Sequence, residues 1–228
     1  MAIAHSNSAA SSTTAAATIA VSPGAALHDV IIAAYVSDSA FSPVTTPPTG
    51  FETTPVDNGT TSLDGMTYES FIKLDATGSE GSVSASVSAD AIVGVMSSFS
   101  GVNNTTPQDV TRVTATNNTS VASIDSPSIT PSTSGALLVA ILAMDANTSA
   151  NATFSTVSGS TGAWTKHIEI IDTTGFRKVA IGSADWTSGA TVVRGACSSN
   201  GALIITVMAL KPAAGGGGGN ILMGQVCT

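Results

Sequence analysis

The chain has 228 residues, of which 10% are charged, and its 7 Lys and Arg against 15 Asp and Glu give a formal net charge of −8. Proteins that bind nucleic acids or anionic membranes present clusters of Lys and Arg, so this charge balance argues against both kinds of partner. Residues 1–21 lack the basic start and Leu-rich core of a signal peptide, and no apolar run reaches the ~18 residues of a membrane-spanning helix. Ser, Thr, Ala, Val and Gly dominate, whereas the residues that fill amphipathic helices are scarce, which predicts an all-β protein.

The first half of the chain is expected to begin with an extended arm, Met1–Thr14, and to continue as five strands. Within it, Asp29–Val36 is an almost continuous apolar run, which is typical of a buried strand. The Pro-rich segment Ser42–Pro55 is expected to be a loop in which Phe51 covers the end of the core. The five predicted strands are Thr18–Val21, Asp29–Val36, Met66–Leu74, Ser82–Ser88 and Ala91–Phe99.

A polar segment, Asn103–Ser120, leads into the second half, with one short strand expected at Asp109–Thr114. The strongly apolar runs of this half are short and rich in β-branched residues, so they predict strands rather than helices. A further segment alternates between Ile and polar residues, which also predicts a strand. The predicted strands are Ala136–Met144, Trp164–Ile171, Phe176–Ala184, Val192-Val193 and Leu203–Leu210.

The two halves can be aligned with few insertions. Asp29–Ala33 corresponds to Ala136–Ala140 at an offset of 107 residues, and Val93–Met96 corresponds to Ile205–Met208 at an offset of 112. A nearly constant offset of this size indicates two pseudo-repeats of about 100 residues rather than an array of short repeats. We place these pseudo-repeats at about 15–102 and 120–212.

Two arrangements fit this pattern of strands. Either each half forms a small sandwich, or the strands of both halves interleave into one larger jelly roll. Each half offers only about five strands, and the segment between them is not an obvious flexible linker. The sequence therefore predicts one antiparallel double-sheet jelly-roll sandwich, which spans residues 15–214.

The last residues, 215–228, differ from the rest of the chain. Gly215–Gly219 is a run of five glycines, which is typical of a flexible tether. The peptide beyond it has apolar side chains but no core of its own. Docking onto another subunit and folding back onto the same domain both remain open for these side chains, which are Ile221, Leu222, Met223 and Val226.

The sequence argues against catalysis. It contains no Gly-x-Ser-x-Gly turn for a nucleophile, and His5, His28 and His167 are expected to be solvated. Glu169 and Asp172 are the closest candidate pair of catalytic carboxylates, but three residues apart on a strand they point to opposite faces unless the strand bulges. We therefore expect no catalytic residues, no cofactor and no metal site.

The remaining residues that could react or bind a ligand are also expected to have no such role. The two cysteines, Cys197 and Cys227, are not spaced as metal ligands and are expected to be free thiols. Aromatic side chains that could stack on a sugar are few. Four of them are expected in core or rim packing, namely Trp164, Trp186, Tyr35 and Tyr68.

Four segments of the chain form a recognisable pattern: SFSGVNNTTPQDVT (Ser98–Thr111), SPSITPSTSGALLVAILA (Ser126–Ala143), TGAWT (Thr161–Thr165) and ALIITVMALKPA (Ala202–Ala213). Together they resemble a family of tailed-phage structural proteins. The similarity covers about residues 15–214, and the glycine tract with its apolar tail departs from the family pattern. Members are jelly-roll components of the head or tail, called cement or decoration proteins when they sit on the capsid.

The resemblance implies a non-enzymatic virion protein that is made in the host cytoplasm and binds the outside of the phage head. Its partners would be the major capsid protein and two further copies of itself in a trimer. It would bind neither nucleic acid nor membranes. It would hold neighbouring capsid proteins together against the pressure of the packaged DNA. The expected contact elements are Met1–Thr14 and Ile221–Val226.

Two other classes of function are kept open. A carbohydrate-binding or adhesion module of a tail fibre or cell surface would show two or more aromatic side chains lining one concave face. A small hydrolase would show two carboxylates facing each other across a groove.

Overall fold

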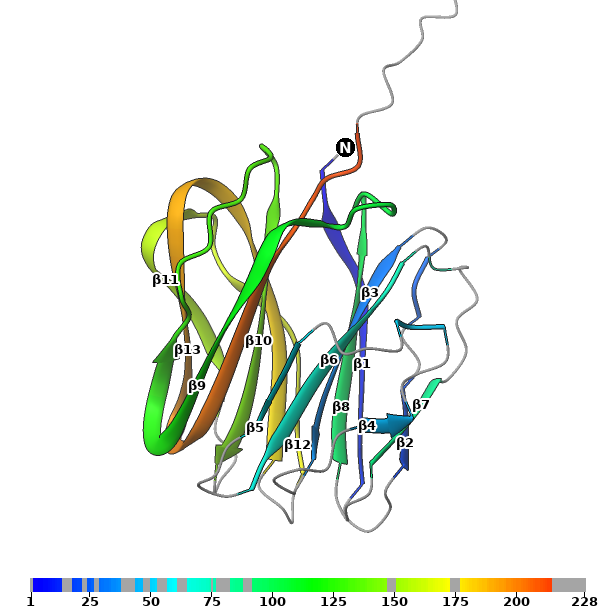
Figure 1. Ribbon diagram of the computed structural model, residues 1–228, viewed down its shortest axis with the longest axis vertical. Coiled ribbons are helices and arrows are strands. Elements are labelled where there is room, and N and C mark those ends of the chain that lie inside the picture. Colours follow the sequence, from blue (N-terminus) through cyan, green and yellow to red (C-terminus); the bar gives the residue numbers. More distant parts are fainter. Residues whose placement is uncertain are drawn as a thin grey trace, which may run out of the picture.

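The computed structural model describes residues 2–13, 18–21, 24–26, 29–37, 44–46, 50–52, 57–60, 65–74, 76, 83–87, 92–146, 151–172 and 177–214. Within these ranges all regular secondary structure consists of β-strands, which confirms the all-β prediction. Figure 1 shows the strands stacked in layers, with the second half of the chain on the left and the first half on the right.

The first half forms a five-stranded antiparallel sheet and a separate three-stranded one. The five-stranded sheet consists, in spatial order, of β1 (Ala4–Thr13), β8 (Ile92–Ser100), β3 (Val30–Ser37), β6 (Thr67–Lys73) and β5 (Asp57–Thr60). The three-stranded sheet consists of β2 (Thr18–Val21), β7 (Val83–Val87) and β4 (Val44–Thr46).

The second half builds its sheet around β10 (Leu137–Ala146). The long strand β13 (Arg177–Leu210) folds back on itself, so that residues 177–185 and 201–210 lie on the two sides of β10. Leu138 faces Ala184 and Ala209, while Met144 faces Lys178 and Leu203, so partner numbers fall as β10 advances and both pairings run antiparallel. The outer strands of this sheet are β12 (Thr165–Ile171), beside residues 178–183, and β9 (Gln108–Asp125), beside residues 201–210.

The middle of β13 forms an outer layer with β11 (Thr153–Thr161) and the end of β9. Gly195 pairs with Phe154 of β11 on one side and with Ile124 of β9 on the other. A Cβ atom at Gly195 would lie 2.8 Å from Leu142 of β10. The outer layer therefore packs directly on β10, and a side chain at this position would have to displace the Leu142 side chain.

Two five-stranded sheets pack face to face, which confirms the predicted double-sheet sandwich. Alternate side chains of β3 and β10 share one central hydrophobic core, whose members include Ile32, Ala34, Val36, Val139, Ile141 and Ala143. The opposite faces of both strands are covered as well. On β3, Ile31, Ala33 and Tyr35 cluster with Val21 of β2, and on β10, Leu138, Ala140 and Leu142 cluster with Ile124 and Val193. Because both faces are covered, β3 and β10 are apolar at nearly every position.

Each sheet is drawn from one half of the chain, and the described strands of the two halves do not interleave within a sheet. The order of partners is the same in both halves. In the main sheets, the order β1-β8-β3-β6-β5 of the first half corresponds, position by position, to β9, residues 201–210, β10, residues 177–185 and β12 of the second half. In the outer layers, the order β2-β7-β4 corresponds in the same way to the end of β9, the middle of β13 and β11. The pseudo-repeats stay a prediction, which this shared order supports, and the jelly-roll connectivity stays a prediction as well. The expected interleaving of strands from the two halves is not seen within any sheet of the described residues.

The strand registers refine the sequence alignment of the halves. Ala34 faces Val95 in the first half, and Ile141, at the offset of 107, faces Thr206 in the second, so the final strands correspond at an offset of 111. Val93 then corresponds to Ile204, which shares the central core with it, whereas Ile205 faces the outer layer. The alignment of Val93 with Ile205 is therefore one residue out.

Most predicted strands agree with the structure to within about two residues, and Phe51 is buried in the core as expected. The N-terminal segment is a correction, because Ala4–Thr13 is an edge strand paired with β8 rather than an arm. Most of its residues are small, and Ser8 and Ser97 join the two strands by a hydroxyl hydrogen bond of 2.8 Å. The strand expected at Asp109–Thr114 extends over all of β9. The sequence did not predict β4, β5 or β11, which are rich in Ser, Thr, Asn and Gly.

Candidate functional site

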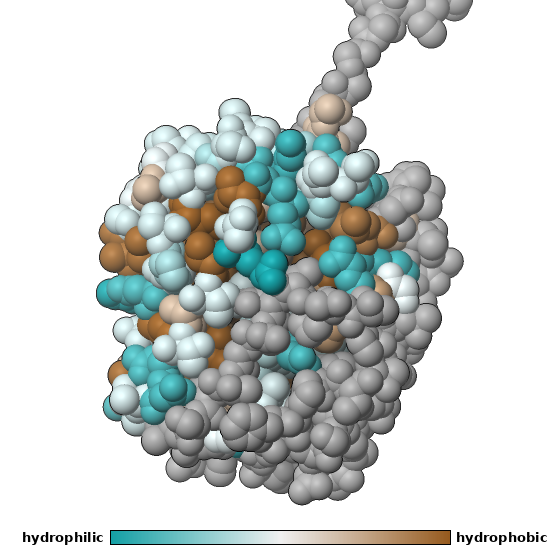
Figure 2. Space-filling view, viewed as in Figure 1, coloured by the Kyte–Doolittle hydropathy of each residue, from teal (hydrophilic) through white to brown (hydrophobic). Residues whose placement is uncertain are grey.

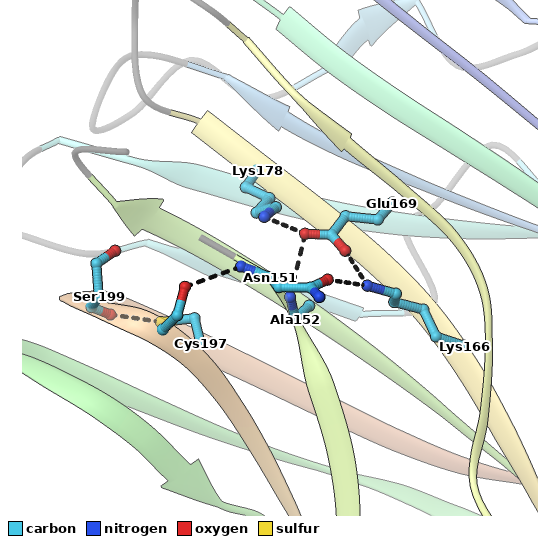
Figure 3. A network of polar contacts seen from close by, with 8 residues as sticks. Asn151, Ala152, Lys166, Glu169, Lys178, Cys197 and Ser199 are labelled. Atoms are coloured by element: carbon cyan, nitrogen blue, oxygen red, sulfur yellow. Dashed lines mark hydrogen bonds and ion pairs between the residues drawn. The ribbon is translucent and has the colours of Figure 1, made fainter. Parts of the chain in front are cut away.

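A network of charged side chains lies where β12 ends and β13 begins (Figure 3). Glu169 is its centre and forms ion pairs with both Lys166 and Lys178. The Glu169 carboxylate also accepts a hydrogen bond from the Ala152 N–H (3.1 Å), and Lys166 donates to the side chain of Asn151. Since the Lys178 side chain is only 4% exposed, Glu169 supplies the counter-charge for a buried ammonium group.

The Glu169 carboxylate is held in its ionised form by these contacts. Burial alone would raise the pKa of Glu169, but hydrogen bonds from Lys166, Lys178 and Ala152 outweigh it and lower the pKa below its ordinary value. Beside this network, Arg177 and Asp145 form a second buried ion pair, which joins β13 to β10. Both pairs link neighbouring strands, so their chemistry is that of structural salt bridges.

The pair Glu169 and Asp172, considered above as a catalytic candidate, is engaged in this framework. β12 does bulge, with a register shift between Lys166 and Ile168, and Glu169 points to the two lysines. Asp172 is fully buried, and its backbone N–H donates to the Arg177 carbonyl (2.8 Å).

Cys197 is a buried free thiol near the same network. Its Sγ donates to the Ser199 carbonyl (2.7 Å), and burial raises the pKa of the thiol. A raised pKa disfavours the reactive thiolate at neutral pH. Cys227 lies outside the described residues.

His5 and His167 correct the expectation of solvated histidines. Their rings stack at a centroid distance of 3.8 Å and an interplanar angle of 7°, and both meet the edge or face of Phe99. His5 lies on β1 and His167 on β12, so the pair joins the two halves of the chain. Each ring forms a 2.7 Å hydrogen bond to a serine, Ser8 or Ser183, and none of these neighbours is charged. His28 lies outside the described residues.

The histidine pair predicts a loss of stability in mild acid. Burial and the charge on His5 lower the pKa of His167 from 6.5 to about 4, and burial lowers the pKa of His5. The unfolded chain therefore takes up protons first, and stability present above pH 6.5 falls as the pH drops toward 4. Since solvent screens the partly exposed rings, we expect the loss to be about 1 kcal/mol. Urea unfolding at pH 7.5 and 5 would measure it, and His167→Phe should reduce the difference between the two pH values. An equal difference in the variant would contradict this account.

A surface depression of about 430 Å³ lies along β11 and the turn that follows it. Phe154 and Trp164 both line it, with ring centroids 5.8 Å apart. Tyr35 and Tyr68 are buried in the core as expected, whereas Trp164 is only partly buried. Phe154 lies on β11, a strand that was not predicted from the sequence, and was not expected to be a site residue. The full lining is Phe154, Ser155, Thr156, Val157, Gly159, Ser160, Thr161, Gly162, Ala163 and Trp164.

Ala2 and Ala213 both approach Gly101 at one end of the molecule. The Ala213 N–H donates to the Gly101 carbonyl (2.7 Å), and a Cβ atom at Gly101 would lie 2.4 Å from the Ala2 carbonyl oxygen. Both the N label and the last described residues lie at the top of Figure 1. The predicted contact residues of the tail, Ile221, Leu222, Met223 and Val226, lie outside the described residues.

On the side seen in Figure 2, hydrophobic side chains form separate patches among white and teal polar ones. No group of three or more His, Cys, Asp and Glu side chains in the described ranges could hold a metal ion. In the same ranges there is no helix with the length and hydropathy needed to cross a membrane.

The chain matches no protein-family model, no curated protein and no solved structure.

Proposed function

We propose that this chain is a non-enzymatic virion protein that binds the outside of a phage head and stabilises contacts between major capsid proteins. The observation that carries the proposal is that Ala2 and Ala213 both approach Gly101 at one end of the two-sheet body. In the sequence, the glycine tract and the apolar tail come directly after Ala214, the neighbour of Ala213. One end of the protein can thus present the tail and the 101–107 connection to the same partner.

The body itself suits a mechanical role. Its two five-stranded sheets share a continuous core, and its buried ion pairs tie neighbouring strands together. Interiors packed in this way are nearly incompressible, so load applied at one end is transmitted through the body. Several weak contacts made together by a tail and a body surface would give strong attachment.

The test is binding of the purified protein to undecorated shells of the major capsid protein. We expect saturable binding and a higher melting temperature of the decorated shells. Replacing Ile221, Leu222, Met223 and Val226 together by Ser should weaken binding at least about tenfold, because these side chains supply the apolar contact.

The matched control changes the same segment without removing its apolar groups. Replacing Gly215–Gly219 by five serines keeps the tether and should leave binding unchanged. Failure of the wild-type protein to bind shells would overturn the proposal. Tight binding by the variant with serine at positions 221, 222, 223 and 226 would exclude the tail as the contact. Light scattering of the free protein would test the trimer.

A further inference from the structure

We propose that the depression along β11 is a binding subsite for neutral saccharides. This inference goes beyond capsid attachment and is independent of it, because β11 belongs to the outer layer and not to the 101–107 connection. It rests on the aromatic side chains, the hydroxyl groups and the absence of charge in the lining.

The aromatic part of the depression is held in a fixed geometry. Phe154 contacts Trp164 and also lies against the backbone of Gly182, where an added Cβ would approach its ring to 2.6 Å. The Trp164 Nε1–H donates to the Thr156 hydroxyl (3.0 Å), which fixes the indole ring from its polar edge. A ring that is already ordered loses little entropy when a ligand stacks on it.

The hydroxyl groups beside Trp164 form a chain whose direction is determined by its ends. The indole N–H can only donate and the Gly162 carbonyl can only accept, so the Thr156 hydroxyl must donate to Thr161 (2.7 Å) and Thr161 to Gly162 (2.8 Å). Each threonine oxygen has then used its proton but keeps a lone pair. Both threonines therefore present acceptors, which suit a ligand rich in O–H donors.

The depression is also where apolar surface is left in water. Among the described residues, Val157 is the large hydrophobic side chain that remains exposed, at 47%, and it lines the depression. None of the lining residues is charged, which disfavours phosphates, nucleotides and other ionic ligands. A pyranose ring has an apolar face of C–H groups and a rim of hydroxyl groups. Its apolar face suits Trp164 and Val157, and its hydroxyl groups suit the threonine acceptors.

The test is saturation-transfer NMR with the full chain and three neutral disaccharides, lactose, maltose and diacetylchitobiose. A shallow, open site predicts a Kd of about 1 mM for at least one of them. Trp164→Ala should weaken that binding at least about tenfold. Trp186→Ala is the matched control, since Trp186 is also partly buried but is not part of the lining, and it should bind as the wild type does.

Val157→Ser provides a second variant in case Trp164→Ala disturbs folding. Its exposed position should leave the melting temperature unchanged, and binding should weaken several-fold. Binding of none of the three sugars, or equal binding by wild type, Trp164→Ala and Val157→Ser, would overturn the proposal. A preference for sialylated or sulfated sugars over their neutral counterparts would also contradict it.

Discussion

Glu169→Ala is expected to destabilise the protein by about 3–5 kcal/mol, because it leaves the buried Lys178 ammonium without a counter-charge. The same change removes the acceptor of the Ala152 N–H and the partner of Lys166. For a protein of this size the melting temperature should fall by about 10 °C. Urea unfolding and a thermal scan at pH 7 would measure both quantities.

An exposed ion pair in the same half of the chain provides the control. Arg194 and Asp125 are joined by two hydrogen bonds of 2.7 and 2.8 Å, but their side chains are 45% and 40% exposed. Asp125→Ala should therefore cost less than about 1 kcal/mol. If Glu169→Ala costs no more than Asp125→Ala, the ion pairs of Glu169 do not stabilise the fold.

The pH dependence gives a further check on Glu169. Its pKa is lowered in the folded state, so its contribution is present above the pKa of an unfolded Glu and is lost as the pH falls through the folded value. The wild type should lose this contribution in acid, whereas Glu169→Ala has none to lose. The stability difference between the two proteins should therefore shrink below the ordinary range of glutamate titration.

Phe99→Ala is expected to cost about 3–5 kcal/mol, because Phe99 is fully buried in the core shared by the two sheets. Its ring also meets both His5 and His167, at centroid distances of 5.8 and 5.9 Å. The cavity left by alanine would lie under the contact that joins β1 to β12. Equilibrium unfolding in urea would give the change in free energy.

Phe99→Leu and Val157→Ala are the controls for this prediction. Leucine keeps most of the volume and should cost less than about 1.5 kcal/mol, and Val157→Ala, at an exposed position, should stay within about 0.5 kcal/mol. If Phe99→Ala is as stable as Phe99→Leu, the packing between the two sheets does not depend on this ring.

The sequence predicts the central strands of this fold well, for a physical reason. Ala136–Met144 and Leu203–Leu210 are buried on both faces, so their apolar runs are continuous and easily recognised. The edge and outer strands have no such pattern. In β11 and β9 the exposed positions carry Ser, Thr and Asn, which leaves only Phe154, Val110, Val113 and a few other apolar side chains as a signal.

The candidate sites depend on contacts that a linear pattern does not contain. His5 and His167 lie in different halves of the sequence, and only the packing of β1 against β12 brings them together. Glu169 reaches Lys166 because β12 bulges, which the alternation of polar and apolar residues did not indicate. The one-residue error in aligning Val93 has a similar cause, since runs of Ile, Val and Met look alike at neighbouring offsets and only the strand register distinguishes them.

Hydrogen–deuterium exchange of the protein bound to undecorated capsid shells tests the proposed attachment most directly. The account predicts slower amide exchange on binding at residues 100–103 and 211–214, where Gly101 and Ala213 meet, and unchanged exchange at residues 153–161 of β11. Unchanged exchange at 100–103 and 211–214, or protection confined to β11, would contradict it.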